Sequence, residues 1–107
     1  MESKVIFTHY KVLSNGWVKS LPRRGTRGGM LKPTLDSEGF LRVNISVGGR
    51  VVQKKVHRLV AIAFLHNPKD YPDVLHKNGD LSDNRVENLE WGSRRRIGNR
   101  ESYIFTI

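Results

Sequence analysis

The pattern of apolar and polar residues predicts two β-hairpins in the first half of the chain. Residues 40–47 alternate between apolar and polar side chains in their second half, and two glycines separate them from residues 50–56. Such alternation is typical of strands with one buried face, so these two segments are expected to pair as a hairpin. Residues 10–21 are expected to form an earlier hairpin around Asn15-Gly16, because both residue types tolerate the positive φ of a tight turn.

In the second half of the chain, the sequence predicts two helices and a further strand. Apolar residues recur at helical intervals across residues 57–65, which predicts a short amphipathic helix that packs on the hairpins. Residues 74–76 follow a connector with two prolines and are expected to form a further strand. Beyond Trp91, Ser93 is a suitable N-cap, so residues 94–103 are expected to form a final helix.

Positive charge is concentrated in the first half of the chain. Residues 1–56 contain eleven Lys and Arg against three Asp and Glu, whereas residues 57–107 contain eight against seven, which gives a formal net charge of +9. A surface this basic attracts polyanions, because neutralising phosphates releases their condensed counterions. Charge alone does not separate DNA from RNA, from an anionic protein, or from a simple gain in solubility.

Basic side chains are available for contact with a nucleic acid in three places. Residues 23–29 contain three glycines and no apolar periodicity, so they are expected to form a mobile loop that follows a phosphate backbone. The second hairpin and the predicted last helix supply the other two sets. The predicted DNA-contacting residues are Arg23, Arg24, Arg27, Lys54, Lys55, Arg94, Arg95 and Arg96.

Length and composition exclude several classes of protein. A chain of 107 residues is expected to form one domain with a modest core. It contains no cysteine, which excludes disulfides and cysteine-ligated zinc sites. No segment has the length and apolarity of a membrane span or of a signal region, so a cytoplasmic protein with no membrane partner is expected. Trp17 and Trp91 are both expected to lie in the core.

Two segments of the chain carry a combined motif. Residues 10–21 read Tyr-Lys-Val-Leu-Ser-Asn-Gly-Trp-Val-Lys-Ser-Leu, and residues 56–91 contain Val-His-Arg-Leu-Val, His76 and the run Asn-Leu-Glu-Trp that begins at Asn88. Together they resemble the small HNH homing endonucleases of phages and introns, including the N-terminal modular DNA-binding motif of that family. The first segment departs from the family pattern, because Leu13 is inserted and one residue is absent between Asn15 and Gly16.

The resemblance implies a fold and a setting for this chain. The expected fold class is α+β, with small N-terminal β-hairpins followed by an HNH-like ββα-metal unit. Residues 1–56 would form the basic hairpin region and residues 57–107 the HNH-like region, within one compact domain. The expected location is the cytoplasm of a bacterium that carries a phage or a prophage.

By resemblance, the catalytic residues are His76 and Asn88. In the family, a histidine on a strand activates water against a DNA phosphodiester, and the asparagine braces the following loop and helps to orient that histidine. An imidazole suits this role because it exchanges protons near neutral pH. The alternatives are a half-buried structural histidine and an asparagine that closes a turn. Asn84 is expected to form a turn together with Asp80 and Asp83, and His57 is expected to be structural.

The two positions that hold the metal ion in the family carry hydrocarbon in this chain. Leu75 stands before His76, where Asp or Asn is usual, and Ile97 stands six residues after Trp91, where Asn or His is usual. Mg²⁺ and Mn²⁺ need oxygen ligands, so no metal-binding residue is assigned to this chain. Mg²⁺ or Mn²⁺ would be the cofactor of an active enzyme.

Three functions are compatible with this pattern. The first is a small basic DNA-binding protein of the HNH lineage with weak or lost cleavage. The second is an active metal-dependent endonuclease that nicks DNA with His76 as general base. The third is a phage-encoded inhibitor that keeps the fold and binds a host nuclease or a defence complex. The sequence does not reveal the oligomeric state.

Overall fold

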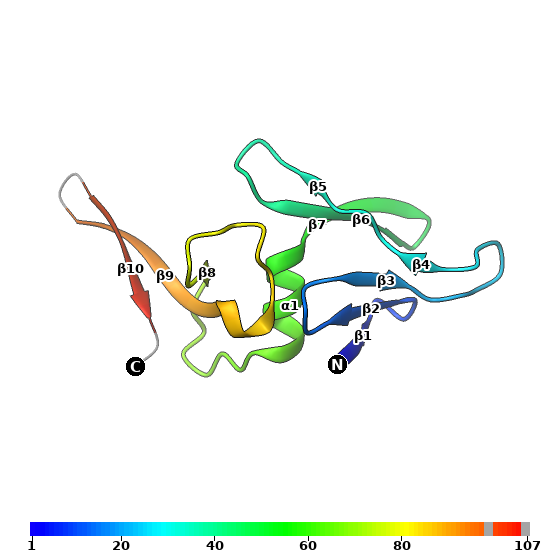
Figure 1. The fold of residues 1–107 in the computed structure, drawn as a ribbon, viewed down its shortest axis with the longest axis horizontal. Coiled ribbons are helices and arrows are strands. Elements are labelled where there is room, and N and C mark those ends of the chain that lie inside the picture. The colour runs from blue at the N-terminus through cyan, green and yellow to red at the C-terminus, as the bar shows by residue number, and fades with distance from the viewer. Residues whose placement is uncertain (98–99, 106–107) are drawn as a thin grey trace.

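The computed structural model describes residues 1–97 and 100–105, with the side chains of residues 1–93 (Figure 1). Within this part of the chain, short antiparallel strands surround a single α-helix, as expected for an α+β protein. The helices are α1 (Val56–Phe64) and the 3-10 turn η1 (Val86–Asn88). The strands are β1 (Ser3–Ile6), β2 (Tyr10–Leu13), β3 (Val18–Ser20), β4 (Gly29–Met30), β5 (Thr34–Leu35), β6 (Leu41–Val47), β7 (Arg50–Lys55), β8 (Asp73–His76), β9 (Leu89–Ile97) and β10 (Arg100–Phe105).

The strands form three small antiparallel sheets in the described residues. Their strand orders are β1-β2-β3-β4, β5-β6-β7 and β10-β9-β8. β2 and β3 join at the predicted Asn15-Gly16 turn, and β6 pairs with β7 in a register that places Val47 opposite Arg50. Both predicted hairpins are therefore confirmed. Strand β1, which the sequence pattern missed, adds to the first hairpin by pairing with β2.

Helix α1 lies at the centre of the molecule, between the N-terminal sheets and the unit formed by β8 and β9 (Figure 1). The predicted helix over residues 57–65 is confirmed with a shift of one residue. Because each sheet is too small to bury its own apolar face, the helix supplies the surface on which they pack. The buried core consists of Tyr10, Val12, Val18, Val43, Ile45, Val56, Leu59, Val60, Ala61, Val74, Leu89 and Trp91.

The predicted helix over residues 94–103 is wrong. The chain continues along β9 and returns as β10, in a register that places Ile97 opposite Arg100. Gly98 stands inside the predicted helix, and glycine disfavours helix strongly. Residues 103–105 are aromatic or β-branched, and such residues favour strands. The capping potential of one serine is a weaker local signal than these preferences.

The strand predicted at residues 74–76 is confirmed as part of β8, which pairs with β9. Trp91 is buried as predicted, and its Nε1 donates a hydrogen bond to the Leu65 carbonyl at 3.1 Å. Trp17 was also predicted in the core, but it is 46% exposed, so that prediction is wrong. Trp17 belongs to the hairpin turn itself, where its backbone N–H donates to Asn15. No helix among the described residues is long and apolar enough to cross a membrane.

Candidate active site

Strand β8 carries the half-buried His76 at its end, where the side chain lines a cavity of about 280 Å³. Pairing with β9 fixes this end of the strand, because His76 lies opposite Leu89 at the edge of the core. The cavity is formed by residues from α1, β8, the end of β7 and the loops on either side. Its lining residues are Glu38, Phe40, Lys55, His57, Arg58, Asp73, Val74, Leu75, His76, Gly79 and Leu81.

The loop that follows β8 folds back so that the side chain of Asn84 lies against His76. Asn84 is 4% exposed, and its Oδ1 lies 2.7 Å from Nε2 of His76. The sequence pattern assigned Asn84 only to a turn. No sequence signal distinguished it from its neighbours, because its contact with His76 depends on the path of the whole loop.

Asn88, the other predicted catalytic residue, is 5% exposed and makes its hydrogen bonds within the same loop. Its Oδ1 accepts from the backbone N–H of Asn78 at 3.1 Å, and its Nδ2 donates to the Asn78 side chain and to the Asp83 carbonyl. These bonds tie the two ends of the loop together. The side chain bonded to His76 is Asn84.

His57, at the start of α1, is a residue of the cavity that the sequence analysis assigned only to structure. It is 4% exposed and stacks on Phe40 with ring centroids 4.7 Å apart, and its ring lies 5.1 Å from that of His76. Burial, followed by repulsion from His76, lowers the pKa of His57 to about 3. Its Nδ1 is buried and has no hydrogen-bond partner in the described residues. His57 therefore lines the cavity as an uncharged imidazole.

Two acidic side chains of the loops next to the cavity are engaged by arginines. Arg85 donates hydrogen bonds of 2.8 Å from Nε and Nη2 to the two oxygens of Asp83, and these bonds lower the pKa of that carboxyl. Asp36 accepts from Arg42 at 2.8 Å, and this bond lowers its pKa to about 2. Both carboxylates are thus held in the charged form by arginines of their own loops and strands.

The described side chains around His76 do not form a ligand set for a hard metal ion. Leu75 lines the cavity beside His76 and is 5% exposed, so hydrocarbon occupies the place next to the histidine. Among the residues whose side chains are described, no group of three His, Cys, Asp or Glu is arranged to hold a metal. Mg²⁺ and Mn²⁺ require several oxygen ligands.

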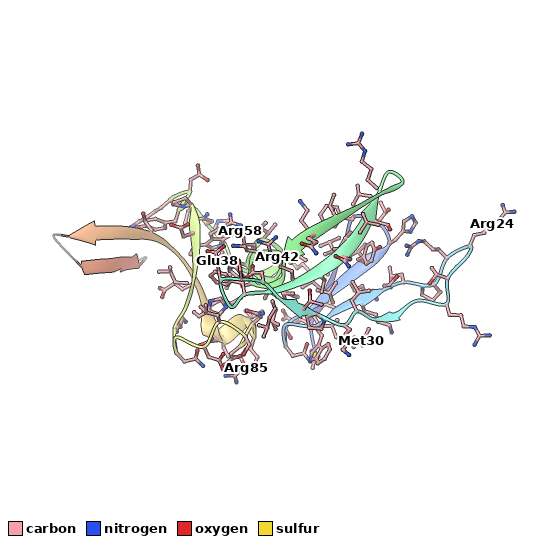
Figure 2. The ribbon with its side chains drawn as sticks, turned by 90° about the horizontal axis from the view of Figure 1, so that it is seen from above. Arg24, Met30, Glu38, Arg42, Arg58 and Arg85 are labelled. Atoms are coloured by element: carbon pink, nitrogen blue, oxygen red, sulfur yellow. The ribbon has the colours of Figure 1, made fainter. Side chains whose placement is uncertain are left out.

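The predicted phosphate-contacting arginines of residues 23–29 differ in their surroundings. Arg23 is half-buried, with its guanidinium 5.4 Å from the Tyr10 ring and a 3.2 Å hydrogen bond to the Ser20 hydroxyl. Arg24 and Arg27 are exposed, and Figure 2 shows Arg24 extending from the tip of the loop. The loop therefore presents two free guanidinium groups and uses the third to hold its base.

The other predicted DNA-contacting residues also differ from one another in their surroundings. Lys54 is exposed on β7 near the Phe7 ring, whereas Lys55 lies 4.5 Å from the Phe40 ring and 3.7 Å from a Glu38 oxygen. Lys55 thus belongs to the cavity. The backbone of Arg94, Arg95 and Arg96 lies in β9, and their side chains are outside the part that the structure describes.

Comparison with known proteins identifies relatives of this chain. The family described as HNH endonuclease matches residues 54–98. Two uncharacterized HNH endonucleases of Acanthamoeba polyphaga mimivirus, L245 and L247, are 43% identical over 61 residues and 35% identical over 88 residues. These matches cover 57% and 81% of this chain, but only 18% and 21% of the relatives.

A solved structure is also similar. The DNA endonuclease I-HmuI of Bacillus phage SP01 is 35% identical over 83 residues, which are 78% of this chain and 45% of that enzyme. Its structure, which is described as showing DNA binding and cleavage by an HNH homing endonuclease, superposes with a TM-score of 0.75 over 85% of this chain and 52% of that one. The chain thus spans about half the length of this relative or less. It is a homologue of the HNH homing endonucleases, and residues 54–98 form its HNH endonuclease domain.

Proposed function

We propose that this chain is a DNA-binding protein of the HNH homing-endonuclease lineage in which cleavage is weak or lost. The observation that carries the proposal is Leu75, which lines the cavity beside His76 with hydrocarbon where the family has Asp or Asn. His76 can serve as a base, but the strand position beside it, where the family has a carboxylate or amide oxygen for the ion, offers only hydrocarbon. Without that ion, charge developing on the phosphate and on the leaving oxygen has no partner.

DNA binding is supported by the distribution of charge and by the homologue. The exposed Arg24 and Arg27 extend from the first sheet, and Arg50 and Lys54 are exposed on β7. These groups are free to neutralise phosphates, whereas Arg42 and Arg85 are paired with carboxylates. I-HmuI, which shares this fold, binds and cleaves DNA.

The salt dependence of binding to a labelled duplex tests this function. Each neutralised phosphate adds about 0.9 to the slope of log affinity against log salt concentration. Arg24→Ala with Arg27→Ala should therefore flatten the slope by about 1.8. As a control, Lys4→Ala with Lys69→Ala removes the same charge from exposed positions outside the predicted contact set. An equal change in both double variants, or no change in either, would contradict the assignment of this loop to the DNA interface.

An active endonuclease is the second candidate. It is favoured by the presence of His76 and Asn88 together, with His76 lining a cavity. An active enzyme would need a metal ligand in place of the hydrocarbon of Leu75, from another side chain or from the DNA itself. Nicking of plasmid DNA separates the two candidates, because only the second requires metal-dependent cleavage that is lost in His76→Ala.

A further inference from the structure

The buried side chain of Asn84 lies between His76 and the turn of the N-terminal hairpin. On one side its Oδ1 lies 2.7 Å from Nε2 of His76. On the other side Gly16 approaches so closely that a Cβ at that position would lie 2.8 Å from the carbonyl carbon and oxygen of Asn84. The backbone N–H of Val86 donates to the carbonyl of Ser14 at 2.9 Å, which fastens the same two loops together.

The direction of this hydrogen bond decides whether His76 can act as a base. If the Asn84 oxygen accepts, Nε2 carries the hydrogen and the lone pair of Nδ1 is free to take a proton from water. If the Asn84 amide group donated instead, Nε2 would accept and Nδ1 would carry the hydrogen. In that case neither ring nitrogen would offer a free lone pair.

We propose that Asn84 is a positioning residue that holds His76 as the Nε2–H tautomer, and that the turn around Gly16 keeps Asn84 in place. The inference deepens the proposed function, because it takes His76 to be the inherited base of an HNH site. It also links the hairpin predicted to contact DNA to the histidine by a continuous path of contacts through Gly16, Asn84 and His76.

The bonding of Asn84 favours this role over a purely structural one. Among the residues whose side chains are described, the side chain of Asn88 makes three hydrogen bonds that close the loop, whereas that of Asn84 makes a single one, to His76. The Nδ2 of Asn84 is buried without a partner in the described residues. A buried donor without a partner is unfavourable and needs an explanation, and a functional role of the residue is one such explanation.

Nuclear magnetic resonance of the His76 ring in the full chain tests the proposal without DNA and without any cleavage. In the wild type, the two ring nitrogens should show the Nε2–H tautomer, with an Hε2 proton that exchanges slowly with water. Asn84→Leu keeps the branched shape and the number of side-chain heavy atoms but offers no acceptor, so the slow exchange should be lost. Ser82→Ala removes an exposed hydroxyl of the same loop that donates to Asp80 and not to His76, so it should leave the tautomer and the exchange unchanged.

A charged acceptor provides a second, directional readout. Asn84→Asp should keep the Nε2–H tautomer and move the midpoint of the His76 titration to higher pH by about one to three units, because a carboxylate favours the protonated ring. If Asn84 only stabilised the loop, the substitution Asn84→Asp would not be expected to move this midpoint to higher pH. A wild-type ring in the Nδ1–H form, or an unchanged midpoint in a folded Asn84→Asp, would overturn the proposal.

The role of the hairpin turn has its own matched pair of variants. Gly16 has φ of +93° and contacts Asn84, whereas Gly25 has φ of +91° and nothing within 4 Å of an added Cβ. Both alanine substitutions place a side chain at nearly the same positive φ, but only the Cβ of Gly16→Ala would press on Asn84. Gly16→Ala should accelerate exchange of the His76 Hε2 proton at least tenfold relative to Gly25→Ala. Equal exchange rates in the two folded variants would show that the turn around Gly16 does not keep Asn84 in place against His76. Because these measurements need no cleavage, they stand or fall separately from the proposed function.

Discussion

The neutral state of His57 predicts that the fold loses stability in mild acid. In the folded chain its pKa is lowered to about 3, whereas in the unfolded chain a histidine titrates near its ordinary value of 6.5. Below pH 6.5 the unfolded chain binds a proton that the folded chain excludes, so acid favours unfolding. The contribution of neutral His57 is fully present above pH 6.5 and is lost progressively as the pH falls toward 3.

The magnitude follows from the slope of this linkage. One pKa unit corresponds to about 1.4 kcal/mol, so lowering the pH from about 6.5 to about 4.5 should reduce the free energy of unfolding by at most about 2.7 kcal/mol. Small domains are stable by about 5–15 kcal/mol in total, so this loss is a large share. Asp36 and Asp83 act at lower pH, because their stabilising charged forms are lost only as the pH falls below the ordinary aspartate value of 3.8.

Urea unfolding followed by tryptophan fluorescence between about pH 7 and pH 4.5 measures the effect. His57→Phe preserves an aromatic ring against Phe40 and removes the titrating group, so its stability should depend much less on pH. His66→Phe changes an exposed histidine outside the cavity and should follow the wild type. Parallel pH profiles for the wild type and His57→Phe would refute the assignment of this acid sensitivity to His57.

Two further variants, one single and one double, have defined outcomes. Tyr10→Phe removes the buried hydroxyl that accepts a hydrogen bond from the backbone of Ser46 at 2.9 Å, so urea unfolding should show a loss of about 1–2 kcal/mol, and an unchanged midpoint would contradict this. Leu75→Asp with Ile97→Asn should create Mn²⁺ binding, measured by titration calorimetry, together with metal-dependent nicking that disappears when His76→Ala is added. A double variant that folds but binds no more Mn²⁺ than the wild type would show that these two positions are not the missing ligands.

The sequence predicted those parts of the fold that follow a strong local period. The hairpin of β6 and β7 has alternating apolar residues and paired glycines, and α1 has apolar residues at helical spacing, so both were found. The C-terminal strands were missed because a capping serine and a run of arginines are compatible with a helix. The preference of residues 103–105 for strands was the stronger signal there.

The site could be predicted only in part. His76, Asn88 and the hydrocarbon at Leu75 were singled out because they belong to a motif with characteristic spacing, and the catalytic role of the first two stays a prediction. The contact of Asn84 with His76 was not predictable, since it joins residues eight positions apart across an irregular loop. His57 reaches the cavity because Phe40 and His76 approach it from other elements, and periodicity carries no information on such tertiary contacts.

Nicking of supercoiled plasmid tests the central claim most directly. The wild type and His76→Ala are incubated with plasmid in Mg²⁺ and in Mn²⁺, at protein concentrations that saturate DNA binding in the same buffer. We predict that the wild type binds the plasmid and converts it to the open circular form no faster than His76→Ala does, in either metal. Fast conversion by the wild type that requires the metal and is abolished in His76→Ala would contradict the claim that cleavage is weak or lost.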